Sequence, residues 1–155
     1  MVNERNYIML VCFDVDGTLA DVSHRVHFWQ QKPKNWNMFK SEMVNDTPIE
    51  QICNIARTMH QEGHNVILCS GRSEDTRDMT EDWLSKHGIT FDALYMRAEK
   101  DYRSDDIVKK ELLDQIVFDW GQKPDIWFDD RPRVVKMLRE NGVFVVDVYQ
   151  GTEDF

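Results

Sequence analysis

Several features are missing from this sequence, and each absence excludes a class of protein. The three cysteines, Cys12, Cys53 and Cys69, form neither an even set nor a CxxC pair, which argues against a disulfide framework. The longest apolar run near the N-terminus, residues 7–13, is too short to span a membrane and precedes no small-residue cleavage site. We therefore expect reduced cysteines and a cytoplasmic protein without a membrane segment.

The sequence also lacks an excess of positive charge. Its formal net charge is −9, whereas proteins that coat nucleic acid are usually basic, because contacts with phosphates drive their affinity. A broad nucleic-acid-binding surface is therefore not expected. An enzyme that grips one terminal phosphate through a local basic patch stays compatible with this charge, and part of the acidic excess could form a metal site.

The order of apolar segments indicates the fold class. The 155 residues contain no repeat, low-complexity segment or long linker, which suits a single domain over residues 1–155. Apolar runs typical of buried parallel strands alternate with segments of helical spacing, which predicts an α/β fold with a mostly parallel five-stranded sheet between helices. The expected strands are residues 7–13, 65–69, 93–96, 126–128 and 143–148.

Helices are expected between these strands. One begins with Pro48 at its first position and ends at Gly63. The residues between Ala20 and Asp46 break the alternation because they are polar and aromatic, and we interpret residues 22–46 as a small helical insert after the first strand. The other expected helices are residues 74–87, 105–117 and 131–140.

Polar side chains gather where three of the expected strands end. Asp14 and Asp16 follow the first strand, Ser70-Gly71-Arg72 follows the second, and Asp129-Asp130 follows the fourth. The carboxyl ends of parallel strands meet at one edge of a sheet, where ligands bind in such folds. Two carboxylates ~4 Å apart repel by about 4 kcal/mol at an effective dielectric near 20, so protons or a cation must compensate them. Oxygen ligands without histidine or cysteine favour Mg²⁺.

The place of Asp14 suits nucleophilic chemistry. It ends a buried strand, which fixes its backbone, and its carboxylate could attack phosphorus to form an aspartyl-phosphate. Asp16 could protonate the leaving oxygen and then activate water. Gly17 allows a sharp turn, and Thr18 could hold Asp16 through its hydroxyl. Lys109 could neutralise the nucleophile and the charge that develops on the phosphoryl group.

Each of these residues also has an ordinary structural explanation. Asp130 could cap the helix that opens at Arg131-Pro132, and Asp105 could lie in a first helical turn, where acids suit the helix dipole. Lys109 could be solvated. The DxDG segment could form a calcium loop, but Arg25 stands where that loop needs its twelfth-position carboxylate. Only the joint pattern favours catalysis.

The joint pattern resembles a known superfamily. DVDGTL at 14–19, LCSGR at 68–72, Lys109 and FDDR at 128–131 occur in the order typical of haloacid dehalogenase (HAD) phosphohydrolases. DVDGTLADVSHR, DYRSDDIVKKE, FDDRPRVVKM and the C-terminal DVYQGTEDF further resemble the 3′-phosphatase domain of phage-type polynucleotide kinase–phosphatase. The resemblance implies a HAD-like Rossmannoid three-layer sandwich, hydrolysis of phosphoric monoesters and a Mg²⁺ cofactor.

The resemblance also implies roles for individual residues. Asp14 matches the nucleophile, Asp16 matches the general acid–base with its carbonyl on the metal, and Lys109 matches a catalytic lysine. Arg25 matches an essential arginine that faces the substrate. The expected substrate- and phosphate-binding residues are Thr18, Arg25, Ser70, Gly71, Arg72 and Asp105, and the expected metal ligands are Asp14, Asp16, Asp129 and Asp130.

One departure from the family concerns its kinase domain. That domain carries a GxxxxGK[ST] phosphate loop, which this sequence does not contain. We therefore expect phosphatase activity only, alone or beside a separate kinase or ligase. The phage-like resemblance suggests a viral protein that works in a bacterial cytoplasm.

The expected insert suggests the substrate. It interleaves aromatic and basic residues, namely Phe28, Trp29, Trp36 and Phe39 with Lys32, Lys34 and Lys40. Aromatic rings can stack on bases at roughly 1–3 kcal/mol per base, with Trp36 the best candidate, although Phe28, Trp29 and Phe39 could instead pack the insert onto the core. We expect a polynucleotide 3′-phosphatase acting on 3′-phosphorylated DNA or RNA ends. The alternatives are a small-molecule phosphatase, such as a 5′-nucleotidase, and a non-catalytic end-binding module.

Overall fold

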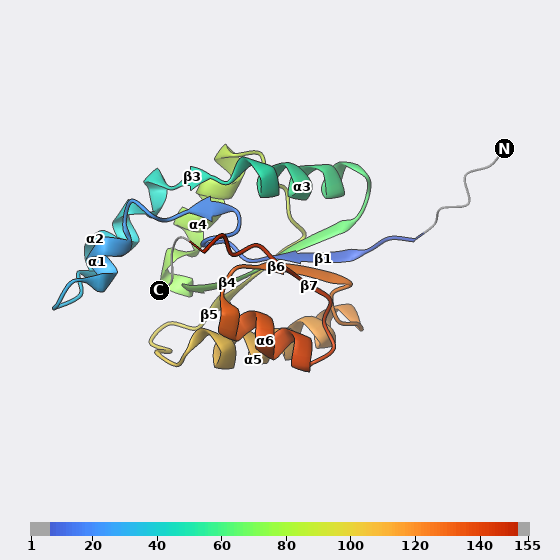
Figure 1. Ribbon diagram of the computed structural model, residues 1–155. Helices are drawn as coiled ribbons and strands as arrows, with labels where there is room; N and C mark the ends of the chain where they lie inside the picture. The colour runs from blue at the N-terminus through green and yellow to red at the C-terminus, as the bar shows by residue number, and fades with distance from the viewer. Residues whose placement is uncertain (1–6, 152–155) are drawn as a thin grey trace.

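A parallel sheet forms the centre of the computed structural model, which describes residues 7–151. Its strand order is β5-β4-β1-β6-β7 (Figure 1), and every neighbouring pair runs parallel. The expected α/β fold with a parallel five-stranded sheet is therefore confirmed. The strands are β1 (Leu10–Phe13), β4 (Asn65–Ser73), β5 (Ala93–Arg97), β6 (Ile126–Asp129) and β7 (Val145–Asp147).

Helices cover both faces of this sheet. α3 (Glu50–Gln61) and α4 (Arg77–Lys86) lie on one face, and α5 (Asp105–Trp120) and α6 (Pro132–Glu140) lie on the other (Figure 1). Each face has its own cluster of buried apolar side chains. The result is three layers, in which these four helices cover the faces of the sheet and not the carboxyl ends of its strands.

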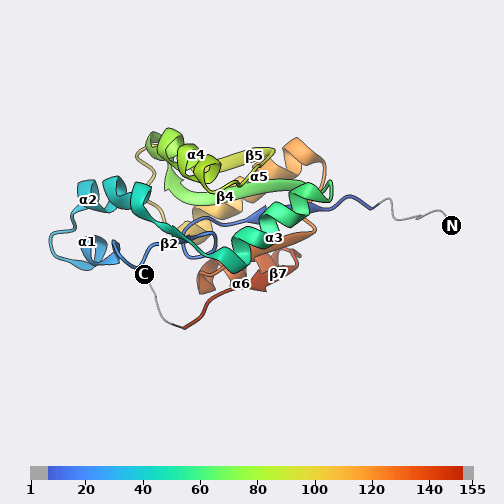
Figure 2. The ribbon, with the colours of Figure 1, turned by 90° about the horizontal axis from the view of Figure 1, so that it is seen from above.

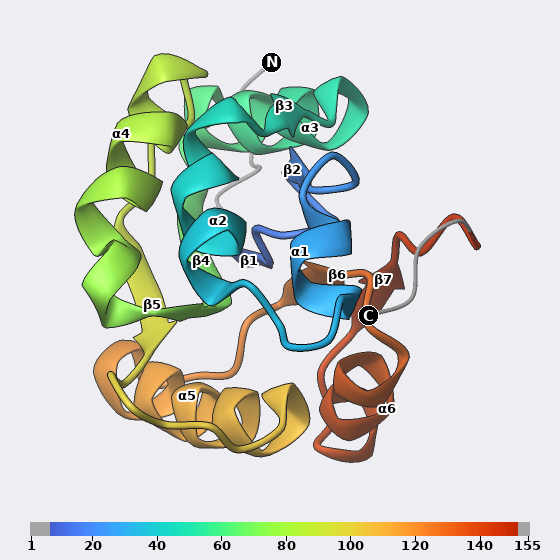
Figure 3. The same cartoon turned by 90° about the vertical axis from the view of Figure 1, so that its left-hand side faces the viewer.

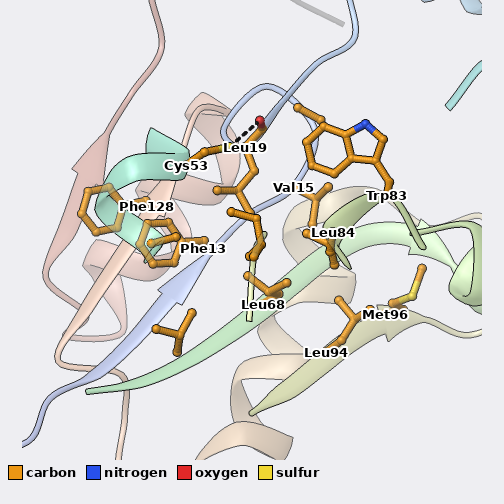
Figure 4. Close-up of a cluster of buried hydrophobic side chains, with 14 of the residues drawn as sticks. Phe13, Val15, Leu19, Cys53, Leu68, Trp83, Leu84, Leu94, Met96 and Phe128 are labelled. Atoms are coloured by element: carbon orange, nitrogen blue, oxygen red, sulfur yellow. Dashed lines mark hydrogen bonds between the residues drawn. The ribbon is translucent and has the colours of Figure 1, made fainter. Parts of the chain in front are cut away.

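Strand β1 is buried on both faces, which explains why its sequence is apolar throughout. Val11 and Phe13 point into the cluster under α3 and α4, while Leu10 and Cys12 point into the cluster under α5 and α6. Successive side chains of a strand alternate between faces, so a strand covered on both sides needs an unbroken apolar run. Figure 4 shows the first cluster, in which the ring of Phe13 stacks on Phe128 with 4.6 Å between centroids.

The insert is attached by a second, two-stranded sheet. β2 (Ala20–Asp21) and β3 (Thr47–Pro48) pair antiparallel, and between them lie α1 (Val26–Gln30), α2 (Trp36–Ser41) and the 3₁₀ helix η1 (Glu42–Asn45). Figure 2 shows this segment beyond the end of the main sheet, and Figure 3 looks onto it from that end. The insert therefore lies over the strand ends that carry the polar residues.

Some element boundaries differ from those expected from the sequence. The first strand begins at Leu10 rather than Tyr7, because pairing with β4 starts there, and Tyr7 and Ile8 are exposed. Pro48 belongs to β3 and not to a first helical turn, since α3 begins at Glu50. η2 (Glu74–Thr76) precedes α4 as a 3₁₀ turn, and β7 is shorter than residues 143–148. Two elements are longer than expected: β4 continues to Ser73, so that Ser70-Gly71-Arg72 lies within the strand, and α5 continues to Trp120.

Two further expectations concern cysteines and membranes. Cys12, Cys53 and Cys69 are buried free thiols, as expected. Within residues 7–151, none of the helices combines the length and the apolar character that crossing a bilayer requires. The last four residues of the DVYQGTEDF segment, 152–155, lie outside the described residues.

Candidate active site

Strands β1 and β6 bring three carboxylates together at their carboxyl ends. Oxygens of Asp14, Asp129 and Asp130 lie within 4.8 Å of one another. Asp129 Oδ1 accepts hydrogen bonds from the backbone N–H groups of Asp130 and Arg131 at 2.9 and 3.1 Å, whereas α6 has no side-chain cap. Asp130 is thus not used as a helix cap, and its carboxylate is turned toward the acidic cluster.

Lys109 extends from α5 into this cluster. Its Nζ donates to Asp14 Oδ1 and to Asp129 Oδ2 at 2.8 Å each. Only 2% of the residue is exposed, so it is not a solvated lysine. Burial raises the pKa of Asp14 well above its usual value, and the charge of Asp129 adds to this effect while Lys109 opposes it. If all three carboxyls are ionised, they and the ammonium carry two negative charges in excess, which one divalent cation would balance.

The donor set fits a hard divalent cation such as Mg²⁺. All three residues in the group offer carboxylate oxygens, which Mg²⁺ prefers over softer ligands. Gly17 keeps the loop after β1 close to Asp130. Its φ is +81°, and a Cβ there would lie 2.6 Å from Asp130 Cγ, so only glycine both adopts this turn and leaves room for the carboxylate.

Thr18 has a different partner from the expected one. Its hydroxyl donates to Asp14 Oδ2 at 3.1 Å and lies 3.5 Å from Asp130 Oδ1, so it does not hold Asp16. The reason is the tight turn after β1, in which the backbone N–H groups of Thr18 and Leu19 both donate to the carbonyl of Val15. Thr18 and Lys109 together hold the two oxygens of Asp14, which fixes the plane of its carboxylate.

Asp16 points toward two arginines instead of the acidic cluster. Its Oδ1 accepts from Arg72 Nε and Nη2 at 2.9 and 2.6 Å and from Arg25 Nη2 at 3.1 Å. Burial alone would raise the pKa of Asp16, but Arg72 and Arg25 outweigh it and lower the pKa to about 2. In this arrangement Asp16 is held as an anion, and its low pKa makes its carboxylate a weak base. Both halves of its expected role, accepting and donating a proton, therefore require these contacts to loosen.

Both arginines are engaged by the protein, which differs from the expected roles. Arg25 is fully buried, with its guanidinium carbon 4.6 Å from the ring centroid of Phe39, so it does not face a substrate. Arg72 borders the cleft but also donates to Thr80 Oγ1 at 3.0 Å. Ser70 is buried, and its Oγ accepts from the backbone N–H of Arg72. In this structure the arginines position Asp16 rather than present free donors to a phosphate.

Asp46 completes this network and was not identified from the sequence. Its carboxylate accepts from Arg25 Nε and Nη2 at 2.8 and 3.0 Å and from Arg72 Nη2 at 2.9 Å. Nε2 of His24 lies 2.7 Å from the same carboxylate, and the Trp83 indole donates to the Asp46 carbonyl. No local motif marks this residue. Charge balance explains its place, because two buried arginines need two carboxylates, but the sequence does not reveal that these arginines are buried.

Asp105 also pairs within the protein. It contacts Arg97 Nη2, and Arg131 Nε lies 3.2 Å from its Oδ2. A Cβ on Gly71 would lie 2.9 Å from Asp105 Oδ1, so glycine is needed for this close approach. Asp105 and Gly71 therefore connect β4, β5 and the start of α6 beside the site.

A cleft of about 680 Å³ opens over these residues. At its base lie Asp14, Asp16, Lys109 and Asp130, and the insert forms one of its walls. Phe39 is buried, as the packing alternative requires, whereas Trp36 is 48% exposed. Lys34 Nζ lies 4.0 Å from the ring centroid of Trp29. The cleft wall therefore combines aromatic faces with positive charge.

Comparisons with known proteins show the family to which this chain belongs. The model of the polynucleotide kinase PNKP phosphatase domain (HAD_PNKP) matches residues 8–155, whereas no curated protein gives a significant match. A chain of the Pnkp1/Rnl/Hen1 complex is 30% identical, with a TM-score of 0.76 over 99% of this chain and 50% of that one. A second chain, from the Pnkp1/Rnl/Hen1 RNA repair complex, is 29% identical, with a TM-score of 0.76 over 98% and 46%.

The chain thus spans about half the length of these two solved chains. L-2-haloacid dehalogenase from Xanthobacter autotrophicus is 16% identical, with a TM-score of 0.59 over 92% of this chain and 78% of that enzyme, and shows the shared HAD fold alone. The family match covers nearly the whole sequence. The chain belongs to the HAD-type family of the polynucleotide kinase PNKP phosphatase domain.

Proposed function

We propose that this phosphatase-family domain is a Mg²⁺-dependent polynucleotide 3′-phosphatase that acts through an aspartyl-phosphate on Asp14. The observation that carries the proposal is the position of Asp14 at the base of an open cleft, held by Lys109 and Thr18 beside the Asp129–Asp130 pair. This arrangement supplies an oriented nucleophile, a fixed positive charge and carboxylate ligands for a cation.

The first step is attack by a carboxylate oxygen of Asp14 on phosphorus. The new bond from Asp14 to phosphorus forms while the bond from phosphorus to the 3′ oxygen breaks, and the leaving oxygen takes up a proton from Asp16 or through water. Lys109 stabilises the charge that develops on the phosphoryl oxygens. A bound Mg²⁺, held by Asp14, Asp129 and Asp130, would supply further neutralisation of these oxygens.

The second step is hydrolysis of the aspartyl-phosphate. Asp16 takes a proton from water, whose oxygen attacks phosphorus, so phosphate leaves and Asp14 is restored as a carboxylate. Arg25 and Arg72 hold Asp16 as an anion and lower its pKa to about 2, so their contacts with Asp16 must loosen for it to take this proton. The hydrogen bonds from Arg25 and Arg72 keep Asp16 in a fixed orientation between the steps.

The cleft and the relatives support a nucleic-acid end as the substrate. Aromatic and basic side chains line one wall, a combination that suits stacked bases and backbone phosphates. Among the DNA or RNA ends expected, the similarity to a chain of an RNA repair complex supports RNA ends, and it supports assembly with other repair proteins; a separate kinase or ligase would be such a partner.

Substrate preference tests this proposal directly. We expect kcat/KM for a 3′-phosphorylated oligonucleotide to exceed that for a nucleoside 3′-monophosphate by about 5- to 150-fold, the effect of one stacked base. Nucleoside 5′-monophosphates at matched concentrations serve as the control for a 5′-nucleotidase. A higher kcat/KM on mononucleotides would indicate a small-molecule phosphatase, and no turnover of any phosphate ester would favour an end-binding module.

Removal of the cation tests the acidic cluster. We expect a chelator to reduce kcat by about 10²-fold or more, because a metal ion contributes several kcal/mol to stabilisation of the transition state. Added Mg²⁺ should restore the rate. Replacement of Asp130 by asparagine should raise the Mg²⁺ concentration needed for half-maximal activity. A rate that is the same with and without chelator would contradict the metal site.

A further inference from the structure

Tyr102 has an aromatic side chain that belongs to neither of the two buried apolar clusters. It is 89% exposed, more than any other large apolar side chain among residues 7–151. It lies between β5 and α5, on a loop that lines the same cleft as Asp14. A single exposed tyrosine is ordinary on a protein surface, so the surroundings of Tyr102 decide what it can do.

The backbone on both sides of Tyr102 is fixed. Arg97 Nη1 donates to the carbonyl of Asp101 at 3.0 Å and to that of Arg103 at 2.6 Å. The guanidinium of Arg103 in turn pairs with Asp101 and with Glu111 of α5, with the shortest contacts at 2.8 Å. Hydrogen bonds therefore hold the backbone on both sides of Tyr102, while its phenol ring faces solvent. An aromatic group held in this way loses little entropy when a flat ligand stacks on it.

A second exposed aromatic residue lines the same cleft from the insert. Trp36 belongs to α2, and Lys34 Nζ lies 5.5 Å from its ring centroid. In Figure 1 the insert and the loop before α5 project from the same end of the sheet, on opposite sides of the strand ends. Tyr102 and Trp36 thus border the cleft from two walls, with Asp14 at its base.

The charges near Tyr102 narrow the class of ligand. Lys100 lies two residues before it and lines the cleft, as do Lys34 and Arg133. Glu99 and Asp101 also line the cleft, but Asp101 is paired with Arg103. Aromatic faces next to basic side chains suit a single-stranded nucleic acid, whose bases stack while its phosphates meet the cations.

We propose that Tyr102 is a specificity-determining residue that stacks on a base upstream of the terminal nucleotide in the strand that carries the 3′-phosphate. This role rests on the proposed polynucleotide 3′-phosphatase activity and extends it to the second wall of the cleft. Tyr102 touches a part of the substrate that a mononucleotide lacks. It therefore distinguishes an oligonucleotide from a nucleoside monophosphate without taking part in the chemistry at Asp14.

The first experiment measures kcat/KM for Tyr102→Ala on a 3′-phosphorylated single-stranded DNA oligonucleotide and on a nucleoside 3′-monophosphate. We expect a loss of about 5- to 150-fold on the oligonucleotide and no loss on the mononucleotide. Tyr102→Phe should retain the wild-type preference because the ring remains. Phe118→Ala is the matched control, since Phe118 is 84% exposed and is not among the residues that line the cleft. Equal losses on both substrates, or no loss on either, would overturn the role of Tyr102.

A binding experiment separates this role from the proposed function. The dissociation constant of a fluorescent 3′-phosphorylated oligonucleotide is measured by anisotropy with Asp14→Asn, alone and combined with Tyr102→Ala or Phe118→Ala. If Tyr102→Ala weakens binding and Phe118→Ala does not, the stacking role is supported. This holds even if the wild-type protein hydrolyses no oligonucleotide and the proposed function fails. Unchanged binding overturns the stacking role, even if the wild-type protein is an active 3′-phosphatase.

Discussion

Replacement of Asp14 by asparagine is expected to reduce kcat for any phosphomonoester by about 10⁴-fold or more. A neutral amide oxygen is a poor nucleophile and cannot form the aspartyl-phosphate. The fold should persist, because asparagine has the shape of aspartate and can still accept the hydrogen bond from Lys109. Burial and Asp129 already raise the pKa of Asp14, so loss of its charge should leave the free energy of unfolding unchanged or higher.

The measurement therefore has two parts with opposite expectations. Steady-state rates on a 3′-phosphorylated oligonucleotide and on a small phosphate ester should both collapse, while urea unfolding should show no loss of stability. Acid quenching during turnover should trap phosphate on wild-type Asp14 and none on the variant. Asp114→Asn is a matched control, since Asp114 pairs with Lys110 on the exposed surface of α5. Turnover retained by Asp14→Asn would remove the nucleophile assignment.

Strand ends were the most predictable part of the site. Asp14 and the Asp129–Asp130 pair directly follow apolar runs whose continuity results from burial on both faces of the sheet. In a parallel sheet such positions meet at one edge, so their proximity could be inferred before any coordinates were known. The same logic fails at the start of β1. Tyr7 and Ile8 extend the apolar run in the sequence but lie before the pairing with β4 begins.

Side-chain partners were harder to predict because they depend on the path of loops. The turn after β1 carries Thr18 back to Asp14 instead of Asp16, which the spacing of DVDGT does not reveal. Burial of Arg25 follows from the insert, whose Phe39 covers the guanidinium. Pro48 would suit the first position of a helix as well as it suits the edge of the small sheet that attaches the insert. Such choices are made by tertiary packing, not by local preference.

The structure divides the charges of the site into two groups with different balance. Asp14, Asp129, Asp130 and Lys109 leave an excess of two negative charges, which suits a cation. Arg25 and Arg72 are balanced by Asp16 and Asp46 without any ligand. The first group is expected to respond to Mg²⁺, whereas the second should matter for folding whether or not a cation is bound.

Replacement of Asp46 by alanine is accordingly expected to lower the free energy of unfolding by about 3–5 kcal/mol, the usual effect of removing one partner from a buried ion pair. Its side chain is fully buried and serves both arginines. Buried carboxylates can escape an unpaired charge by taking up a proton, but a guanidinium cannot lose one inside a protein. The two arginines would then share the single carboxylate of Asp16, so kcat should fall as well.

Urea unfolding of Asp46→Ala and Asp46→Asn separates the charge from the packing. Asparagine keeps the size of the side chain but not its charge, so Asp46→Asn should also lose stability if charge balance is the cause. Asp114→Ala provides the matched control, because its ion pair with Lys110 is exposed and should contribute no more than about 0.5 kcal/mol. A loss at Asp46 no larger than that at Asp114 would show that the buried arginines do not depend on this carboxylate. Arg25 and Arg72 would then hold Asp16 in place without help from Asp46.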